Sequence, residues 1–215
     1  MSKRKFCIFS GLAGVIGVAL LGLSFAINNG PPPNATGAEL LKFAHDNYAQ
    51  VLWGAWMQAV GPVLIVLFAF SLVHLAGATQ RLAGWMTFFG ATILMTVSLV
   101  ETTFYISALH ADPTTMPDIS LVLISAVQHL YFIVAAPALF LPLGVVLLRS
   151  AVLLRLFGHL ALALAAIFVT SGTVYMLRLT LPGFVLALGG VQALWWLAAA
   201  VTLIVRSAAF STSQA

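Results

Sequence analysis

Charged residues are scarce in this sequence. Asp, Glu, Lys and Arg make up 7% of the 215 residues, against about 25% in an average soluble domain, whereas apolar residues make up 62%. A soluble domain of this size must keep a surface that water can solvate, so the composition excludes an ordinary soluble enzyme and a disordered chain. The net charge of +4 comes from nine scattered Lys and Arg residues, which do not form the clustered basic face that nucleic-acid binding requires.

Cysteine and the signatures of common catalytic sites are scarce too. Cys7 is the single cysteine, which excludes an intrachain disulfide framework. The sequence contains no P-loop and no nucleophile elbow, and no lysine lies within a long apolar run, which excludes a retinal Schiff base. Nothing in the sequence therefore indicates an enzyme, a metal site or a particular cofactor.

Long apolar runs dominate what is present. A bilayer core about 30 Å thick requires about 20 apolar residues in a helix, and six stretches meet that length. They cover residues 7–27, 49–75, 83–108, 120–147, 151–176 and 183–205. None shows the alternation of a membrane β-strand, so we predict an all-α, polytopic membrane protein in which residues 1–215 form a single bundle of six transmembrane helices.

The basic residues predict the orientation of these spans. With the N-terminus inside, the cytoplasmic side receives Lys3, Arg4, Lys5, Arg81, Arg149, Arg155 and Arg206, and the other side receives Lys42 and Arg178. Cytoplasmic loops carry an excess of Lys and Arg, so both termini are expected in the cytoplasm. We predict a multi-pass protein of a bacterial cytoplasmic (inner) membrane, with the lipid bilayer as its first partner.

The first span also has features of a signal peptide. A basic start precedes it, and the small-x-small triplet Ser24-Phe25-Ala26 lies near its end. Its apolar run of about 20 residues is longer than a signal-peptide core of 7–15 residues. We therefore expect it to be retained as a membrane helix.

The first outer loop, residues 28–48, is predicted to contain a short amphipathic helix. Three prolines, Pro31 to Pro33, favour an extended segment. Thr36 and Glu39 then have the spacing of a capping box, in which each side chain bonds a free backbone N–H of the other residue. The helix that starts there is expected to lie at the outer membrane interface and to run into the second span.

Ionisable groups within a membrane are costly and usually functional. Glu101 is the only acid inside a predicted span, and it lies about 12 Å below the outer end of its helix. Tyr105 follows one helical turn later on the same face. Removal from water disfavours a carboxylate, so we expect Glu101 to be protonated and neutral at rest, with His129 as its partner.

Other strong hydrogen-bonding groups are predicted at the same depth as Glu101. They are Gln58, Gln128, His129 and Gln192, and Trp196 lies one turn beyond the last of these. Each polar group costs free energy where it faces lipid, so we expect all of them to turn inward around one polar pocket. The alternative is that the glutamines serve only as hydrogen-bonding glue between helices. The candidate ligand- or proton-binding residues are Glu101, His129, Gln58, Gln128, Gln192, Tyr105 and Trp196.

Three functional hypotheses follow from these residues. The leading one is a non-enzymatic bundle that binds or moves a small ligand or a proton through the outer-half pocket. The second is a structural subunit of a larger membrane complex or of a homo-oligomer, in which Gly11, Gly14 and Gly17 form a close-packing face for a partner helix. The third is a haem- or quinone-binding redox protein, with His74 and His159 as haem ligands.

Three short segments carry a resemblance to a family. They are Gln80-Arg81-Leu82-Ala83-Gly84-Trp85, Leu141-Pro142-Leu143-Gly144, and Gln192-Ala193-Leu194-Trp195 together with Arg206-Ser207. The pattern resembles bacterial six-span integral membrane proteins that are grouped only as a domain of unknown function. The resemblance covers about three quarters of the chain. It implies a six-helix inner-membrane protein and no particular reaction, so it assigns no residue a role.

Overall fold

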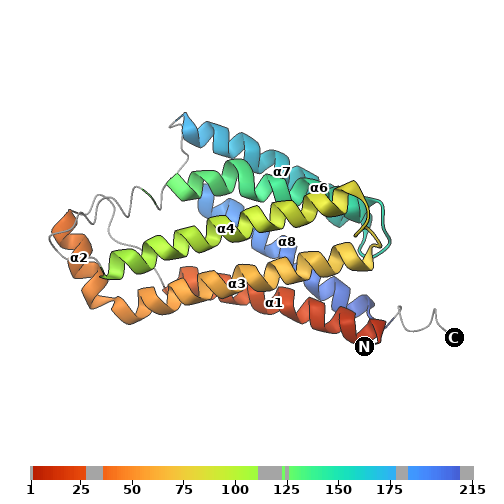
Figure 1. The fold of residues 1–215 in the computed structure, drawn as a ribbon, viewed down its shortest axis with the longest axis horizontal. Helices are drawn as coiled ribbons and strands as arrows, with labels where there is room; N and C mark the ends of the chain where they lie inside the picture. Colours follow the sequence, from red (N-terminus) through yellow and green to blue (C-terminus); the bar gives the residue numbers. More distant parts are fainter. Residues whose placement is uncertain (1, 28–35, 111–122, 124–125, 178–183, 209–215) are drawn as a thin grey trace.

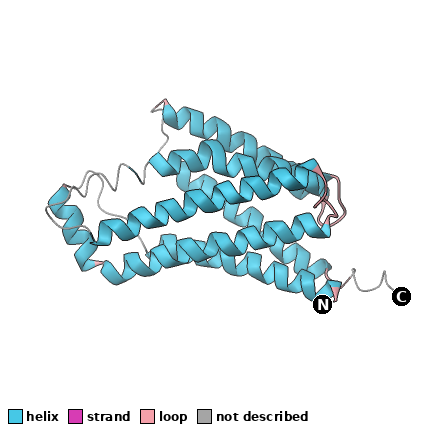
Figure 2. Ribbon diagram, in the orientation of Figure 1, coloured by secondary structure: helices cyan, strands magenta, loops and turns pink. Residues whose placement is uncertain are grey.

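The computed structural model describes residues 2–27, 36–110, 123, 126–177 and 184–208, and these residues form helices joined by short connections (Figure 2). The elements are α1 (Lys3–Ile27), α2 (Gly37–Asp46), α3 (Tyr48–Leu75), α4 (Leu82–His110), the π-helical turn η1 (Tyr131–Ala135), α6 (Ala136–Leu148), α7 (Arg155–Met176) and α8 (Phe184–Arg206). Six helices are long and apolar enough to cross a membrane, and the fourth of them, Ala126–Leu148, contains η1 and α6. The predicted all-α class with six such helices is confirmed.

The fifth helix starts later than the sequence predicts. We expected it to begin at residue 151, but α7 begins at Arg155. Val152 and Leu153 belong to the preceding turn and are buried, at 4% and 2% exposed. An apolar loop that covers the end of the core has the hydropathy of a span without its helical backbone, which explains the error. The predicted start of the fourth span, residues 120–122, lies outside the described residues.

The six long helices follow one another around the bundle in the order α8, α1, α3, α4, α6, α7 (Figure 1). Contacts between α7 and α8 close this order. The start of α1 and the end of α8 lie at the same end of the bundle, and α2 lies at the opposite end. We refer to these as the basic end and the α2 end.

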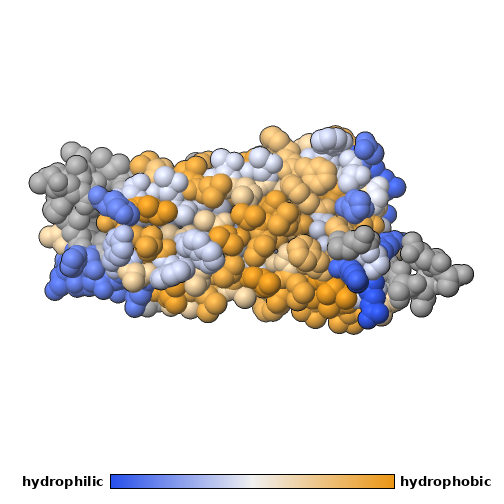
Figure 3. Space-filling view, turned by 60° about the horizontal axis from the view of Figure 1, so that its bottom comes forward, coloured by the Kyte–Doolittle hydropathy of each residue, from blue (hydrophilic) through white to orange (hydrophobic). Residues whose placement is uncertain are grey.

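The basic end is named for its charges. Lys3, Arg4, Lys5, Arg81, Arg149, Arg155 and Arg206 all lie at the helix ends or turns on that side. On the face shown in Figure 3, apolar residues occupy most of the surface between two hydrophilic ends. This distribution places the charged side chains outside the apolar band, as is typical of helices that cross a membrane.

The capping box at the start of α2 is present as predicted. The Thr36 backbone N–H and hydroxyl donate to Glu39 Oε2 at 2.8 and 2.9 Å, and the Glu39 backbone N–H donates to Thr36 Oγ1 at 3.4 Å. These hydrogen bonds hold the pKa of Glu39 below its usual value. Tyr48, where α3 begins, lies against His110 at the end of α4, with 3.4 Å between the hydroxyl and Nε2.

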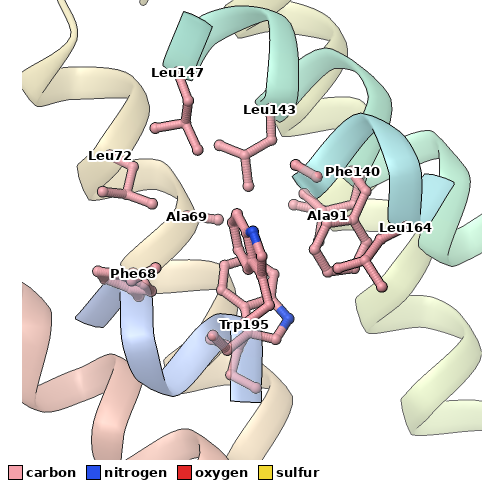
Figure 4. Close-up of a cluster of buried hydrophobic side chains, with 14 of the residues drawn as sticks. Phe68, Ala69, Leu72, Ala91, Phe140, Leu143, Leu147, Leu164 and Trp195 are labelled. Carbon is pink, nitrogen blue, oxygen red and sulfur yellow. The ribbon is translucent and has the colours of Figure 1, made fainter. Parts of the chain in front are cut away.

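Aromatic side chains fill the axis of the bundle (Figure 4). Trp195 and Trp196 of α8 are 4% and 1% exposed, and their rings contact each other and Phe140 of α6. Trp196 also contacts Phe68 of α3, and the Trp195 indole N–H donates to the Phe157 carbonyl at 3.1 Å. These large side chains connect α8 to helices on the far side of the bundle.

Three glycines of α1 pack against neighbouring helices of the same bundle. A Cβ on Gly11 would overlap Ile204 of α8, and one on Gly14 would meet Phe68 at 2.9 Å. A Cβ on Gly17 would lie 2.9 Å from the Gly61 carbonyl oxygen of α3. The hypothesis that these glycines form a free face for a partner helix is therefore wrong, because α3 and α8 already cover that face.

A proline in α6 explains a close contact with α4. Pro142 has no N–H, so the Ala138 carbonyl one turn earlier lacks its usual helical donor. Gly90 of α4 packs directly on this carbonyl, and a Cβ at Gly90 would overlap it. The absence of a side chain at Gly90 thus allows α4 to approach α6 closely.

We predict that Gly90→Ala lowers the melting temperature of the purified protein, because overpacking costs about 1–3 kcal/mol. The matched control is Gly189→Ala in α8, since no atom lies within 4 Å of a Cβ at that position. Thermal unfolding in detergent should leave the control at or slightly above the native value, given the better helix propensity of alanine. Equal melting temperatures for the two variants would contradict the close contact at Gly90.

Candidate functional site

The polar side chains of the predicted layer lie toward the α2 end of the bundle. Gln58 lies ten residues after the start of α3 at Tyr48, and Glu101 lies nine residues before the end of α4 at His110. At 1.5 Å per residue these positions are about 15 and 13–14 Å below the α2 end. The two side chains therefore occupy the same level of neighbouring, antiparallel helices.

A proline and a serine bring α3 and α4 into register at this level. Pro62 cannot donate to the Gln58 carbonyl, which loses its helical partner. The Ser98 hydroxyl of α4 donates to that carbonyl at 3.4 Å. The Thr102 hydroxyl in turn donates to the Ser98 carbonyl at 2.9 Å. Ser98, three residues before Glu101, thus supplies the donor that the Gln58 carbonyl lacks. Backbone carbonyls within a membrane need such a donor, because no water is there to bond them.

Glu101 is 9% exposed, and glutamine side chains lie next to its carboxyl group. Gln128 Nε2, just before η1, donates to Glu101 Oε1 at 3.1 Å. The side chain of Gln58 also lies close to the same carboxyl group. Of the nine Lys and Arg residues, Arg178 lies outside the described residues, and the other eight lie in α2 or at the basic end. Among the described residues, therefore, the Gln128 amide bonds this carboxyl group, and no Lys or Arg lies at its level.

A π-helical turn follows Gln128. The Ala136 N–H donates to the Tyr131 carbonyl five residues earlier, instead of to a carbonyl four residues earlier as in an α-helix. Pro137 stands in the first turn of α6, immediately after the widened turn. A proline ring clashes with the carbonyl four residues before it, so a wide turn at this place relieves that clash. Such turns are rare and often lie at functional sites.

Tyr131, the first residue of η1, connects this region to α8. Its hydroxyl donates to Gln192 Oε1 at 2.8 Å, and Gln192 Nε2 is also within hydrogen-bonding distance of the hydroxyl. Gln192 is 9% exposed, so this pair lies inside the bundle. Tyr105 follows Glu101 by one turn of α4.

The structure brings some of the predicted site residues together. Glu101, Gln58 and Gln128 are in contact, and Tyr105 is half-buried near them. His129 is half-buried beside Gln128, and it is the side chain of Gln128 that donates to Glu101. We call Gln58, Ser98, Glu101, Gln128, Tyr131 and Gln192 the Glu101 cluster.

Two members of this set have partners that the sequence analysis did not name. Gln192 pairs with Tyr131, a residue that the sequence analysis missed, although a tyrosine deep in a span three residues after a glutamine is a recognisable signal. Trp196 packs among the aromatic side chains of the axis, against Phe68 and Phe140. Its role as the wall of a binding site stays a prediction.

The histidines of the third hypothesis belong to different parts of the bundle. His74 is exposed at the end of α3 and contacts Phe6 of α1. His159 is exposed on α7, and its Nδ1 lies 3.0 Å from the Arg155 carbonyl of the same helix. Helix α7 packs against η1, α6 and α8, whereas α3 packs against α1, α2, α4 and α6. The described structure does not bring this pair together.

The fold and the Glu101 cluster define a class: a six-helix bundle of membrane-spanning type with a buried, amide-bound carboxyl group. No protein-family model, curated protein or solved structure matches the chain. The resemblance to six-span bacterial membrane proteins therefore stays a prediction.

We predict that Ser98→Ala destabilises the protein by about 1 kcal/mol, because the Gln58 carbonyl loses its donor. Thr103→Ala is the control, since the Thr103 hydroxyl is exposed and bonds only the Leu99 carbonyl of its own helix. In a Pro62→Ala background the restored N–H should satisfy the Gln58 carbonyl and reduce the cost of Ser98→Ala. A double-mutant cycle on unfolding free energies measures this coupling, and a coupling of zero would contradict the role of Ser98.

Proposed function

We propose that the chain is a multi-pass protein of a bacterial inner membrane with its basic end in the cytoplasm. Six apolar helices support the membrane assignment. The seven basic residues at one end of the bundle support the orientation, because Lys and Arg accumulate on the cytoplasmic side of such proteins. The α2 end then faces the opposite side of the membrane.

The orientation predicts which single cysteines are accessible from outside the cell. Ala38 in α2 and Ala151 in the turn before α7 are both exposed, at opposite ends of the bundle. In a Cys7→Ala background, Ala38→Cys should react with an impermeant maleimide in intact cells, and Ala151→Cys only after permeabilisation. The reverse labelling pattern would overturn the orientation while leaving the fold intact.

We propose that the Glu101 cluster reversibly binds a proton. The observation that carries this proposal is a carboxyl group that is 9% exposed and bonded to the Gln128 amide, with the described Lys and Arg residues elsewhere. A charged side chain in hydrocarbon costs far more than a neutral one, so nothing in this cluster commits Glu101 to its ionised form.

The amide partners suit a group that changes its charge. A glutamine amide can present its N–H to a carboxylate, or its oxygen to a protonated acid after a rotation of the amide. Gln128 and Gln58 can thus satisfy Glu101 in both states without an ion entering the bundle. A small cationic or hydrogen-bond-donating ligand would use the same acceptor oxygens and compete with the proton.

Dicyclohexylcarbodiimide tests this proposal, because this apolar reagent adds to protonated carboxyl groups. Intact-protein mass spectrometry of the protein in liposomes should show an adduct that Glu101→Gln removes and Glu101→Asp retains. The control Glu39→Gln changes the exposed carboxyl group of the capping box and should leave the adduct unchanged. Persistence of the adduct in Glu101→Gln, or no adduct on the native chain at any pH, would overturn the proposal.

Stability measurements distinguish a proton site from a structural one. Glu101→Gln resembles the protonated acid, so its melting temperature should stay close to the native value. If Glu101→Gln unfolds the protein and Glu101→Asp does not, the carboxylate is structurally paired and the proton-binding proposal is wrong. That result would favour the hypothesis of a structural subunit.

A further inference from the structure

The π-helical turn places one more residue in the span than an α-helix of the same length would hold. Ala136 bonds Tyr131, whereas in a continuous α-helix it would bond Phe132. Residues before the turn are therefore shifted by one position relative to α6. If the turn were α-helical and α6 kept its place, each residue before the turn would move by one position. The next residue in the sequence would then take the place that it has now.

This shift applies to the residues that reach the Glu101 cluster. If η1 became α-helical while α6 stayed in place, residues 126–130 would rotate by about 100° around the helix axis. His129 would take the place of Gln128 beside Glu101. Phe132 would take the place of Tyr131 beside Gln192. The sequence thus places a histidine one position along for the contact with Glu101, whereas Phe132 cannot replace the hydrogen bond of Tyr131 to Gln192.

We propose that residues 126–135 form a register switch that exchanges Gln128 for His129 at Glu101. The inference rests on the proposed function, because it assigns a regulatory element to the proton-binding site. In the π register the partner of the carboxyl group is an amide, which cannot accept its proton. In the α register it is an imidazole: the carboxyl O–H bond breaks, an imidazole N–H bond forms, and a carboxylate and an imidazolium remain paired.

The packing indicates which part of the span rotates. Most residues of α6 are buried, and its contact with Gly90 of α4 holds it in place. Residues 126–130 contain one buried side chain, Val127 at 6% exposed, next to the exposed Ala126 and Leu130. Rotation of this short helical segment therefore changes fewer packed contacts than rotation of α6.

The described interactions favour the π register without excluding the other. Tyr131 and Gln192 are hydrogen-bonded only in the π register, and Val127 remains buried in it. Pro137 disfavours the α register, because its ring would face the Ile133 carbonyl. The α register regains a regular helical hydrogen bond to Phe132 and avoids a rare turn geometry. The balance favours the π register, so the α register is the less populated of the two states.

The chain offers a matched exchange that tests the switch. Tyr131→Phe combined with Phe132→Tyr keeps the composition but moves the hydroxyl to the residue that meets Gln192 in the α register. Pro137→Ala removes the clash that disfavours this register. A hydrogen bond of about 1 kcal/mol changes the ratio of the two registers about fivefold. The exchange with Pro137→Ala should therefore populate the α register, and Tyr131→Phe alone should do so less.

Solid-state NMR in liposomes can report the register through carbon–nitrogen dipolar couplings. The sequence has two glutamates, so Glu39→Gln leaves Glu101 as the single labelled carboxyl carbon. With glutamine-amide nitrogen labelled, the coupling to Glu101 should be weaker in the exchange variant than in the native register, because Gln128 leaves the carboxyl group and Gln58 remains. With histidine-ring nitrogen labelled, the coupling should become stronger in that variant. Unchanged couplings in both experiments would overturn the switch.

A second measurement tests the switch if the exchange variant fails to fold. Spin labels at Val127→Cys and Leu130→Cys in a Cys7→Ala background report lipid exposure through collisions with oxygen. In the native register the label at Leu130 should be the more exposed, and Pro137→Ala alone should shift exposure toward the label at Val127. No shift would overturn the proposal. A carbodiimide adduct that persists at Glu101 together with a fixed register would leave the proton-binding proposal intact and contradict the switch alone.

Discussion

A backbone carbonyl inside a bilayer has no water to bond, and the two prolines buried within α3 and α6 each create such a carbonyl. Both carbonyls are covered by α4. Ser98 donates to the one freed by Pro62, and Gly90 packs on the one freed by Pro142. Helix α4 is therefore held against α3 and α6 at defined levels. Glu101 lies three residues after Ser98, so the same requirement that joins the helices also sets the depth of the carboxyl group.

The sequence predicted most of the fold because hydropathy reports the solvent of each segment. Six long apolar runs correspond to six helices, and the local spacing of Thr36 and Glu39 was sufficient to identify a capping box. The predictions were wrong where residues are apolar or small because they pack against other parts of the protein. Val152 and Leu153 are apolar because a turn packs on the core, and the glycines of α1 are small because α3 and α8 approach them. The hydropathy of a residue shows that it avoids water, but it does not show whether its neighbours are lipid or protein.

The candidate site was predictable in part for a related reason. Glu101 and the glutamines were recognisable because a strong polar group deep in a span needs a partner. The partners themselves depend on helix rotation, and η1 changes that rotation by one residue. A regular period of 3.6 residues therefore cannot show that Gln128 donates to Glu101, or that Tyr131 meets Gln192. The same turn is what makes His129 an alternative partner.

The aromatic side chains of α8 close the axis of the bundle on the basic side of Glu101. Trp195, Trp196 and Phe68 are at most 4% exposed, and Leu72 and Leu147 beyond them are fully buried (Figure 4). The Trp195 and Trp196 indoles carry N–H donors and no acceptor, so these side chains offer a cation no ligand, and its passage would carry most of the cost of dehydration. A proton or ligand that enters from the α2 end would therefore meet this apolar column beyond Glu101. Under the proposed function, the protonation of Glu101 then depends on the pH of a single compartment, the one at the α2 end.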